Sequence, residues 1–228
     1  VPTQELGESI LELRVEPTNP WSIDLRMAND VSPALGGKRG EARIRHRNVL
    51  GLGDRFRVAV SGAEGLFDFE TGYSIPLTPF LTEIEIFGDL GRGEIVAGAF
   101  ADDGFNFRSE VERYGIALDQ PLVRTLADDL DFEFRFERRR SRVEFLGNQD
   151  LQLETADEED GRVSLSLLRT TLDWVHREPE QVFAARLRGT FGIDTWDATS
   201  PNSTVGDGGP SLPDGQFQAG LLQLQYAR

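Results

Sequence analysis

The sequence contains no cysteine, so its fold depends on neither disulfide bonds nor a thiolate metal site. It has only two histidines. His46 and His176 lie far apart, and we interpret them as a strand-face residue and a turn residue rather than as metal ligands or bases. No apolar run reaches the roughly 18 residues that a transmembrane helix needs. A membrane β-barrel stays possible, because each of its strands needs only about ten alternating residues.

Positive charge does not dominate, since the net charge is −15 and the pI is near 4.6. This balance argues against a nucleic-acid-binding surface. The glycines mark turns rather than a phosphate-binding loop, which argues against a nucleotide, and no serine lies in a nucleophile elbow. The acidic runs at residues 128–129 and 157–160 lack the spacing of a calcium loop. The sequence therefore predicts no catalytic residues, no metal site, no cofactor and no enzymatic activity.

What the sequence does have is alternation of apolar and polar side chains, clearest in a hairpin over residues 54–77. Side chains alternate at period two along a strand, so Val58 and Val60 share one face while Arg55 and Arg57 share the other. A four-residue turn, Gly62 to Gly65, would place Ser61 opposite Leu66 and Arg57 opposite Glu70. Apolar residues would then face apolar residues, and charges would face opposite charges.

About ten such strands follow Trp21, with no convincing helix between them. Their alternating cores lie near residues 21–28, 42–47, 54–61, 66–77, 81–87, 105–119, 130–137, 162–174, 181–191 and 216–226. Phase changes at Leu167-Leu168 and Leu221-Leu222 predict bulges or doubly buried faces. The fold class predicted is all-β, an antiparallel up-and-down meander.

The connections predicted between these strands alternate in length. Those after the second, fourth, sixth and eighth strands are compact, whereas those after the first, fifth, seventh and ninth are long and polar, including residues 138–161 and 194–215. The turn at Gly62 is the exception. Outer-membrane barrels have this asymmetry, with short periplasmic turns and long external loops.

The two faces of the predicted sheet differ in chemistry. Aromatic residues crowd the apolar face and are predicted to face lipid: Phe67, Phe69, Tyr73, Phe132, Phe134 and Phe136. The charged face is predicted to line a water-filled lumen with Arg43, Arg45, Arg55, Arg57, Asp68, Glu70, Asp131, Glu133 and Arg135. There Asp24, Asp68 and Glu70 would compensate the neighbouring arginines. Period two alone also fits a soluble β-sandwich with a solvated ionic face.

A succession of short motifs then points to a family. In order they are Ile23-Asp-Leu-Arg-Met-Ala-Asn29, Gly36-Gly-Lys-Arg-Gly40, Asn48-Val-Leu-Gly-Leu-Gly-Asp54, Tyr73-Ser-Ile-Pro-Leu77 and Tyr114-Gly-Ile-Ala-Leu-Asp-Gln-Pro-Leu122. This order resembles the outer-membrane translocators of two-partner secretion, the TpsB proteins of haemolysin and filamentous-haemagglutinin type, which are related to BamA. The Asn-Leu-Gly-Asp turn and the two Pro-Leu pairs are its most specific elements.

The resemblance implies a sixteen-stranded outer-membrane barrel preceded by periplasmic POTRA domains. A secreted partner protein would thread unfolded through its pore. Residues 1–17 would be the end of a POTRA-like domain and a linker, and residues 18–228 part of the barrel. The Val-Arg-Gly-Tyr/Phe signature of the family's lumen-inserted loop is not found in the sequence, so we interpret the chain as the front half of the barrel.

These observations predict an outer-membrane pore that exports a secreted partner, with the lipid bilayer as its surroundings. A BamA-like insertase or a porin is the first alternative, and a soluble β-sandwich binding module is the second.

Overall fold

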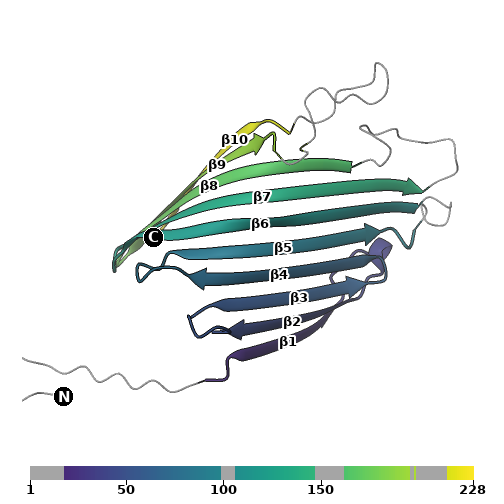
Figure 1. The fold of residues 1–228 in the computed structure, drawn as a ribbon, viewed down its shortest axis with the longest axis horizontal. Coiled ribbons are helices and arrows are strands. Elements are labelled where there is room, and N and C mark those ends of the chain that lie inside the picture. Colours follow the sequence, from purple (N-terminus) through teal and green to yellow (C-terminus); the bar gives the residue numbers. More distant parts are fainter. Residues whose placement is uncertain (1–17, 99–105, 147–161, 196–197, 199–214) are drawn as a thin grey trace, which may run out of the picture.

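The computed structural model describes residues 18–98, 106–146, 162–195, 198 and 215–228. Within these ranges the chain forms one sheet of ten antiparallel strands, in which each strand pairs with the next in the sequence (Figure 1). The strands are β1 (Trp21–Ala28), β2 (Arg39–Arg47), β3 (Arg55–Ala63), β4 (Leu66–Pro76), β5 (Glu83–Glu94), β6 (Asn106–Arg124), β7 (Asp128–Leu146), β8 (Arg162–Glu178), β9 (Gln181–Ile193) and β10 (Gln218–Ala227). The predicted all-β meander is confirmed.

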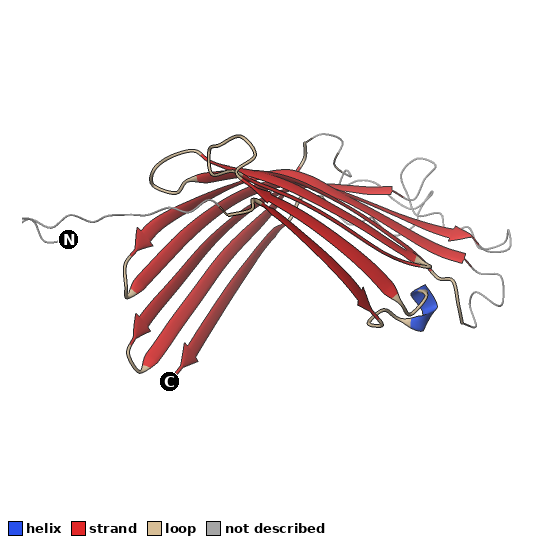
Figure 2. Cartoon of the chain, turned by 90° about the horizontal axis from the view of Figure 1, so that it is seen from below, coloured by secondary structure: helices blue, strands red, loops and turns tan. Residues whose placement is uncertain are grey.

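The sheet is strongly curved and twisted (Figure 2). Its strands fan out in two directions, as the right-handed twist of neighbouring strands requires, and the sheet bends part of the way around a hollow. A β-sandwich needs two sheets packed face to face, so the alternative of a soluble sandwich is wrong. One short 3₁₀ helix, η1 (Pro33–Leu35), interrupts the first connection. No helix in the described ranges is long and apolar enough to cross a membrane.

The hairpin of β3 and β4 has a tighter turn than the sequence predicted. Ala63 pairs with Leu66, Ser61 with Asp68 and Arg57 with Gly72, so the turn consists of Glu64 and Gly65 alone. The predicted pairing of Arg57 with Glu70 is therefore wrong. The error amounts to two residues, which is one full period of a strand, and every side chain keeps its predicted face.

Several strands are longer than their alternating cores. β7 continues to Leu146, although residues 138–161 were predicted to be a connection, and β5 continues to Glu94. Of the two explanations for the phase changes at Leu167-Leu168 and Leu221-Leu222, bulges are wrong, because the registers of β8 and β10 run through them without a shift. A doubly buried face is also wrong for β10, where both leucines are exposed, whereas Leu167 of β8 is buried. The register shifts instead between Pro121 and Val123 of β6. Proline lacks the N–H that an uninterrupted ladder would use.

The predicted asymmetry of the connections is present. Residues 48–54, 77–82, 125–127 and 179–180 form what we call the short-connection rim. The strand ends at the opposite rim adjoin the longer connections: those between β1 and β2, β5 and β6, β7 and β8, and β9 and β10. We call it the long-connection rim, and it also carries the tight turn at Glu64. The backbone N–H of Arg47 donates to the carbonyl of Pro20, which places the chain's entry into β1 at the short-connection rim. The predicted POTRA-like segment, residues 1–17, lies outside the described residues.

Candidate functional site

The strand registers separate the side chains into two faces. One row of directly paired residues crosses nine strands on a single face: Trp21, His46, Phe56, Tyr73, Ile86, Ile116, Phe136, Leu168 and Phe191. All six residues predicted to face lipid lie on this apolar face. The structure thus groups them as the sequence predicted.

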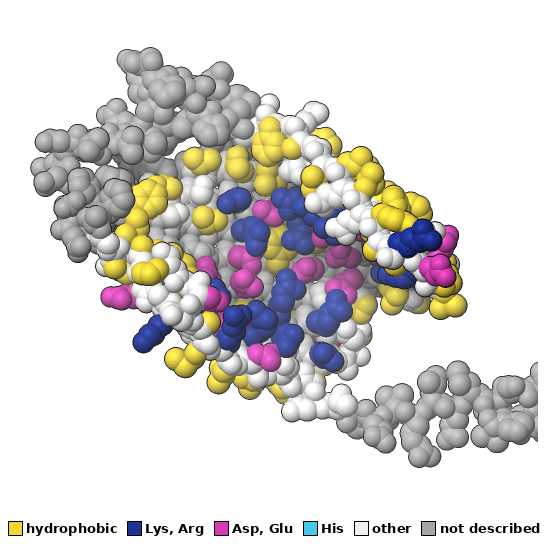
Figure 3. Space-filling model, turned by 180° about the vertical axis from the view of Figure 1, so that it is seen from behind, with side chains coloured by type: hydrophobic (Ala, Val, Ile, Leu, Met, Phe, Trp, Pro, Cys, Tyr) yellow, Lys and Arg dark blue, Asp and Glu magenta, His cyan; other side chains and the backbone are white. Residues whose placement is uncertain are grey.

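The nine residues predicted to line a lumen share the opposite face. Figure 3 looks into the hollow of the sheet and shows that Lys, Arg, Asp and Glu side chains gather there, while apolar side chains lie around its edges. Arg39, Glu41, Arg43, Asp68 and Glu70 line one depression of about 260 Å³ on this charged face. The charged face is thus the concave side of the sheet.

Ion pairs between strands hold the charged face together. Asp24 pairs with Arg45 at 2.6 Å, as predicted. Asp68 and Glu70 lie in one depression with Arg43, as predicted, but Arg55 and Arg57 pair with Glu83 and Glu85 of β5 instead. Further pairs between strands join Asp89 to Arg113, Arg124 to Asp131, Glu137 to Arg169 and Asp173 to Arg186. Glu133 pairs with Arg135 along β7 itself. Opposed arginines such as Arg45 and Arg57 are tolerated because each has its own acid.

One aromatic residue on the charged face was missed by the sequence reasoning. Phe87 is only 5% exposed and pairs with Gly72 on one side and Gly115 on the other. The guanidinium of Arg135 lies 4.7 Å from the centre of its ring, within cation–π range. A side chain at Gly115 would clash with Phe87 and with the backbone of β7. Glycines opposite Phe87 on both neighbouring strands were the available signal, but their pairing requires the register.

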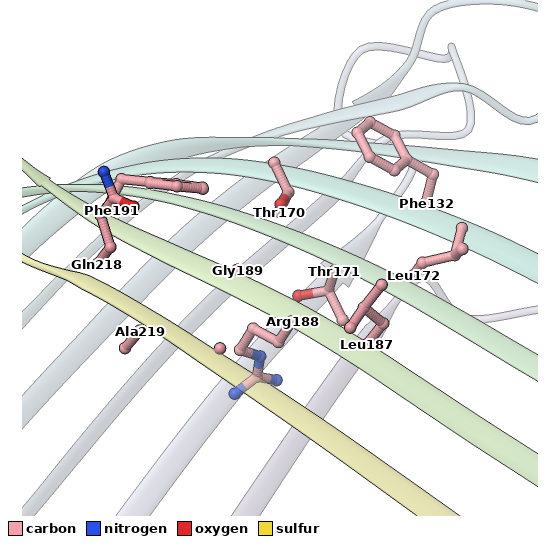
Figure 4. A pocket seen from close by; sticks show the side chains of 11 residues that line it. Phe132, Thr170, Thr171, Leu172, Leu187, Arg188, Gly189, Phe191, Gln218 and Ala219 are labelled. Carbon is pink, nitrogen blue, oxygen red and sulfur yellow. The ribbon is translucent and has the colours of Figure 1, made fainter.

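The apolar face is hollowed where glycines interrupt its larger side chains. A groove of about 520 Å³ lies over Gly189 and Gly220, between Phe132, Leu172 and Phe191 (Figure 4). A second hollow of about 680 Å³ lies over Gly40 and Gly62. Both hollows are open grooves on the surface of the apolar face.

Aromatic residues with polar ends mark the apolar face near the short-connection rim. Tyr73 donates to Asp54 at 2.8 Å, Trp174 to Asp128 at 3.2 Å and Tyr226 to Gln181 at 3.0 Å. Trp21 packs edge-on against His46. Rings that are apolar at one end and hydrogen-bonded at the other suit the boundary between water and hydrocarbon.

The Asn-Val-Leu-Gly-Leu-Gly-Asp motif forms the turn between β2 and β3, and hydrogen bonds within the motif hold this turn together. Asp54 is fully buried and accepts hydrogen bonds from Tyr73 and from the backbone N–H groups of Leu50 and Leu52. Burial acts to raise the pKa of Asp54, but these hydrogen bonds outweigh it and lower the pKa below its ordinary value. Gly51 and Gly53 have φ of 82° and 79°, which favours glycine at both positions.

His176 lies in β8, not in a turn as predicted. It is beyond Trp174 toward the short-connection rim, and its Nδ1 is 2.8 Å from Asp128. The hydrogen bond with Asp128, and then that with Glu178, raises the pKa of His176. Its other close neighbours are the rings of Trp174 and, across the strand pair, Phe183.

We expect the pair of His176 and Asp128 to make the folded protein's stability depend on pH. A raised pKa means that the stabilisation is complete below the unfolded histidine's pKa, about 6.5, and is lost as the pH rises through the higher folded-state pKa. The urea midpoint of the full-length protein in lipid vesicles should fall between about pH 5.5 and about pH 8.5. The fall should shrink in the His176→Gln variant; an unchanged fall would contradict this role for His176.

The apolar face ends abruptly toward the long-connection rim. On β6 it changes from Leu118, Ile116 and Tyr114 to Glu112 and Glu110, and on β7 from Phe136 to Arg138 and Arg140. Beyond this limit the same outer face carries ion pairs instead of apolar side chains. The sequence reasoning missed this change because it ended β7 at Glu137.

No catalytic or metal-binding arrangement emerges from these contacts. Within the described ranges, no group of His, Cys, Asp and Glu residues is placed to hold a metal ion. The structure instead presents a curved wall, charged inside and apolar outside. Comparisons with known proteins then identify the protein family.

The family of haemolysin secretion/activation proteins ShlB/FhaC/HecB matches residues 7–228. The chain belongs to this family. The resemblance stated from the motifs is thereby confirmed, and so is the predicted outer-membrane localisation, since ShlB-family proteins lie in the outer membrane. The family comprises secretion proteins rather than an enzyme class. Among curated proteins, none matches this sequence.

Two solved structures of CdiB show the same fold. CdiB from Escherichia coli superimposes with a TM-score of 0.72 at 16% identity, over 93% of this chain and 38% of CdiB. CdiB from Acinetobacter baumannii gives 0.52 at 11% identity, over 77% of this chain and 38% of that one. BamA from Haemophilus ducreyi lacking POTRA domains 1–3 has a TM-score of 0.49 at 12% identity, over 78% of this chain and 35% of BamA. This ShlB-family chain thus spans less than two-fifths of the length of these proteins.

Proposed function

We propose that this chain is part of a pore that exports a secreted partner protein, threaded unfolded, across the outer membrane. The apolar face contacts lipid, and the charged face lines the water-filled lumen with the nine residues named from the sequence. The chain's membership of the ShlB/FhaC/HecB family supports this function. The proposal assigns no catalytic residue, cofactor or nucleotide.

The division between the two faces is the observation that carries the proposal. Only Phe87, Ala117 and Leu167 are buried apolar residues in the described ranges, so the sheet does not enclose a dry core. Large apolar side chains are exposed instead, among them Ile23 at 66% and Ile86 at 61%. Such a surface is unstable in water but is stable against hydrocarbon. The opposite face, rich in ion pairs, would keep the interior wet and weakly adhesive to a passing chain.

The rims suggest the orientation. In outer-membrane barrels the short turns are periplasmic and the long loops external. The short-connection rim would therefore face the periplasm, and the N-terminal segment entering β1 would come from there. Residues 1–17 would be the end of a POTRA-like domain that captures the partner before it enters the pore. The complete barrel would have sixteen strands.

Deleting the gene of the full-length protein tests the exported substrate directly. We expect one secreted protein to disappear from the culture medium and to be retained or degraded in the periplasm, because its only exit is lost. Mass spectrometry of the medium and of the periplasmic fraction measures this. Restoring the gene should restore secretion.

The same comparison distinguishes the alternatives. Loss of many outer-membrane proteins at once would support a BamA-like insertase and would contradict the export function. Unchanged secretion together with reduced uptake of small solutes would instead support a porin.

A further inference from the structure

The two faces of the sheet exchange their chemical character near the long-connection rim. On the outer face above the apolar band, Arg92 pairs with Glu110 at 2.7 Å, Arg108 with Glu94 at 2.8 Å and Arg140 with Glu112 at 4.0 Å. These side chains are 26–56% exposed. Charged pairs on the outside of a barrel belong in water, so the upper parts of β5, β6 and β7 project beyond the bilayer.

Beyond Arg113 and Arg139, the inner face at the same level carries valine, serine and glycine, and Leu165 lies beside Arg139. Val111 pairs with Ser141, which pairs with Val163, and Val143 pairs with Ser109. Because side chains alternate, these residues share the face on which Arg113 binds Asp89 at the top of the charged hollow. We call the apolar residues of this inner surface the exit patch: Phe107, Val111, Val143, Val163 and Leu165.

The exit patch is accessible, and the neighbouring strand, β5, has glycines at the positions beside it. Val143 is 45% exposed and Phe107 is 37% exposed. On β5, Gly91 and Gly93 lie directly beside Val111 and Ser109. A Cβ atom built on Gly93 would meet nothing within 4 Å. A Cβ atom on Gly91 would lie 3.3 Å from Asp68 Oδ1. The side chains of another segment could therefore lie over Gly93 against the exit patch.

The structure assigns the exit patch to the emerging chain of the secreted partner, which binds it in extended form through apolar side chains at alternate positions. The inference rests on the proposed export function. Three observations support this occupant. The exit patch continues the charged hollow, and it lies at the rim opposite the one where this protein's own chain enters β1. The outer side of the same strands carries ion pairs that belong in water. An extended chain with an apolar residue at every second position presents one complementary face.

The patch also gives direction to export. The charged hollow offers apolar side chains few partners, so a chain within it gains little by staying. The exit patch buries those side chains once they have passed the bilayer. Binding there would favour outward movement over return until the partner folds outside.

A cysteine-scanning experiment on the full-length barrel, reconstituted in lipid nanodiscs, tests the inference. This chain has no cysteine, and any cysteine elsewhere in the full-length protein is replaced by serine. Single cysteines are then introduced in an exit-patch variant (Val143→Cys), a hollow variant (Ala59→Cys) and an outer-face variant (Glu110→Cys). The probe is a peptide of about twelve residues, long enough to span the patch, with valine at alternate positions and a terminal thiopyridyl disulfide. A control peptide has serine in place of valine. The rate of mixed-disulfide formation is measured for each variant.

We expect the exit-patch variant to react with the valine peptide about tenfold faster than the outer-face variant, because burying even one valine accounts for such a factor. The serine peptide should remove the preference, and so should Val111→Asp added to the exit-patch variant. If the hollow variant reacts but the exit-patch variant is no faster than the outer-face variant, the exit patch does not bind the chain although the pore remains. If the hollow variant does not react at all, no peptide enters the hollow, and the pore fails together with the exit patch.

Discussion

Replacing Phe134 with arginine is expected to destabilise the folded barrel by about 2–4 kcal/mol, the cost of arginine on the lipid face near the bilayer midplane. Phe134 lies within the run of Leu130, Phe132, Phe134 and Phe136 on the apolar face of β7. Its direct neighbours are Leu118 of β6 and Thr170 of β8. Neither offers a counter-charge, so the guanidinium would have to reach the distant interface or draw water into the bilayer.

The matched control is Glu133→Arg, one residue earlier on the same strand. Glu133 belongs to the charged face, beside Arg135 and opposite Asp119. An arginine there meets water and a carboxylate, so we expect a far smaller loss of stability. Urea titration of the full-length protein refolded into lipid vesicles, followed by the mobility shift of the folded barrel on gels, measures both variants. Similar losses for the two would mean that the two faces have been assigned the wrong way round.

Most of the face assignment could be predicted from the sequence because period two survives errors in register. The hairpin of β3 and β4 was predicted two residues out of register, yet Arg57 and Phe69 kept their faces. The predicted cross-strand partners in this hairpin, however, were wrong. Arg57 reaches across Gly72 to Glu85 of β5, and this contact depends on the stagger of three strands. Alternation defines a side chain's face, whereas the register defines its partner.

The ends of the strands could not be predicted for a different reason. Above Phe136 the outer face of β7 carries Arg138, Arg140 and Arg142, so the sequence there resembles a polar loop rather than a strand. Within the bilayer an apolar outer face is required, but beyond it the requirement disappears. A prediction based on apolar alternation therefore ends at the membrane boundary instead of at the end of the strand. Phe87 was missed because its glycine neighbours lie on other strands.

Arg138 provides the second large effect, and it follows from the same boundary. It is the first charged residue on the outer face of β7 beyond Phe136, yet it is only 1% exposed. Its guanidinium donates to Ser166 Oγ at 3.0 Å and to the carbonyl of Thr195 at 2.9 Å. Ser166 donates to the same carbonyl at 2.7 Å. Arg138 thus joins β7, β8 and the start of the connection after β9 at the level where the strands leave the bilayer.

We expect Arg138→Met to destabilise the full-length barrel by about 2–3 kcal/mol, since methionine keeps the packing but not the charged hydrogen bonds. The control is Arg140→Met, two residues further along the same face. Arg140 has 43% of its side chain exposed and lies 4.0 Å from Glu112, and such exposed pairs contribute about 0–1 kcal/mol. The urea midpoint in lipid vesicles measures both variants. Equal costs would show that Arg138 acts as one more solvated charge above the membrane, whereas a selective loss would show that it fastens the β9–β10 connection to the barrel wall.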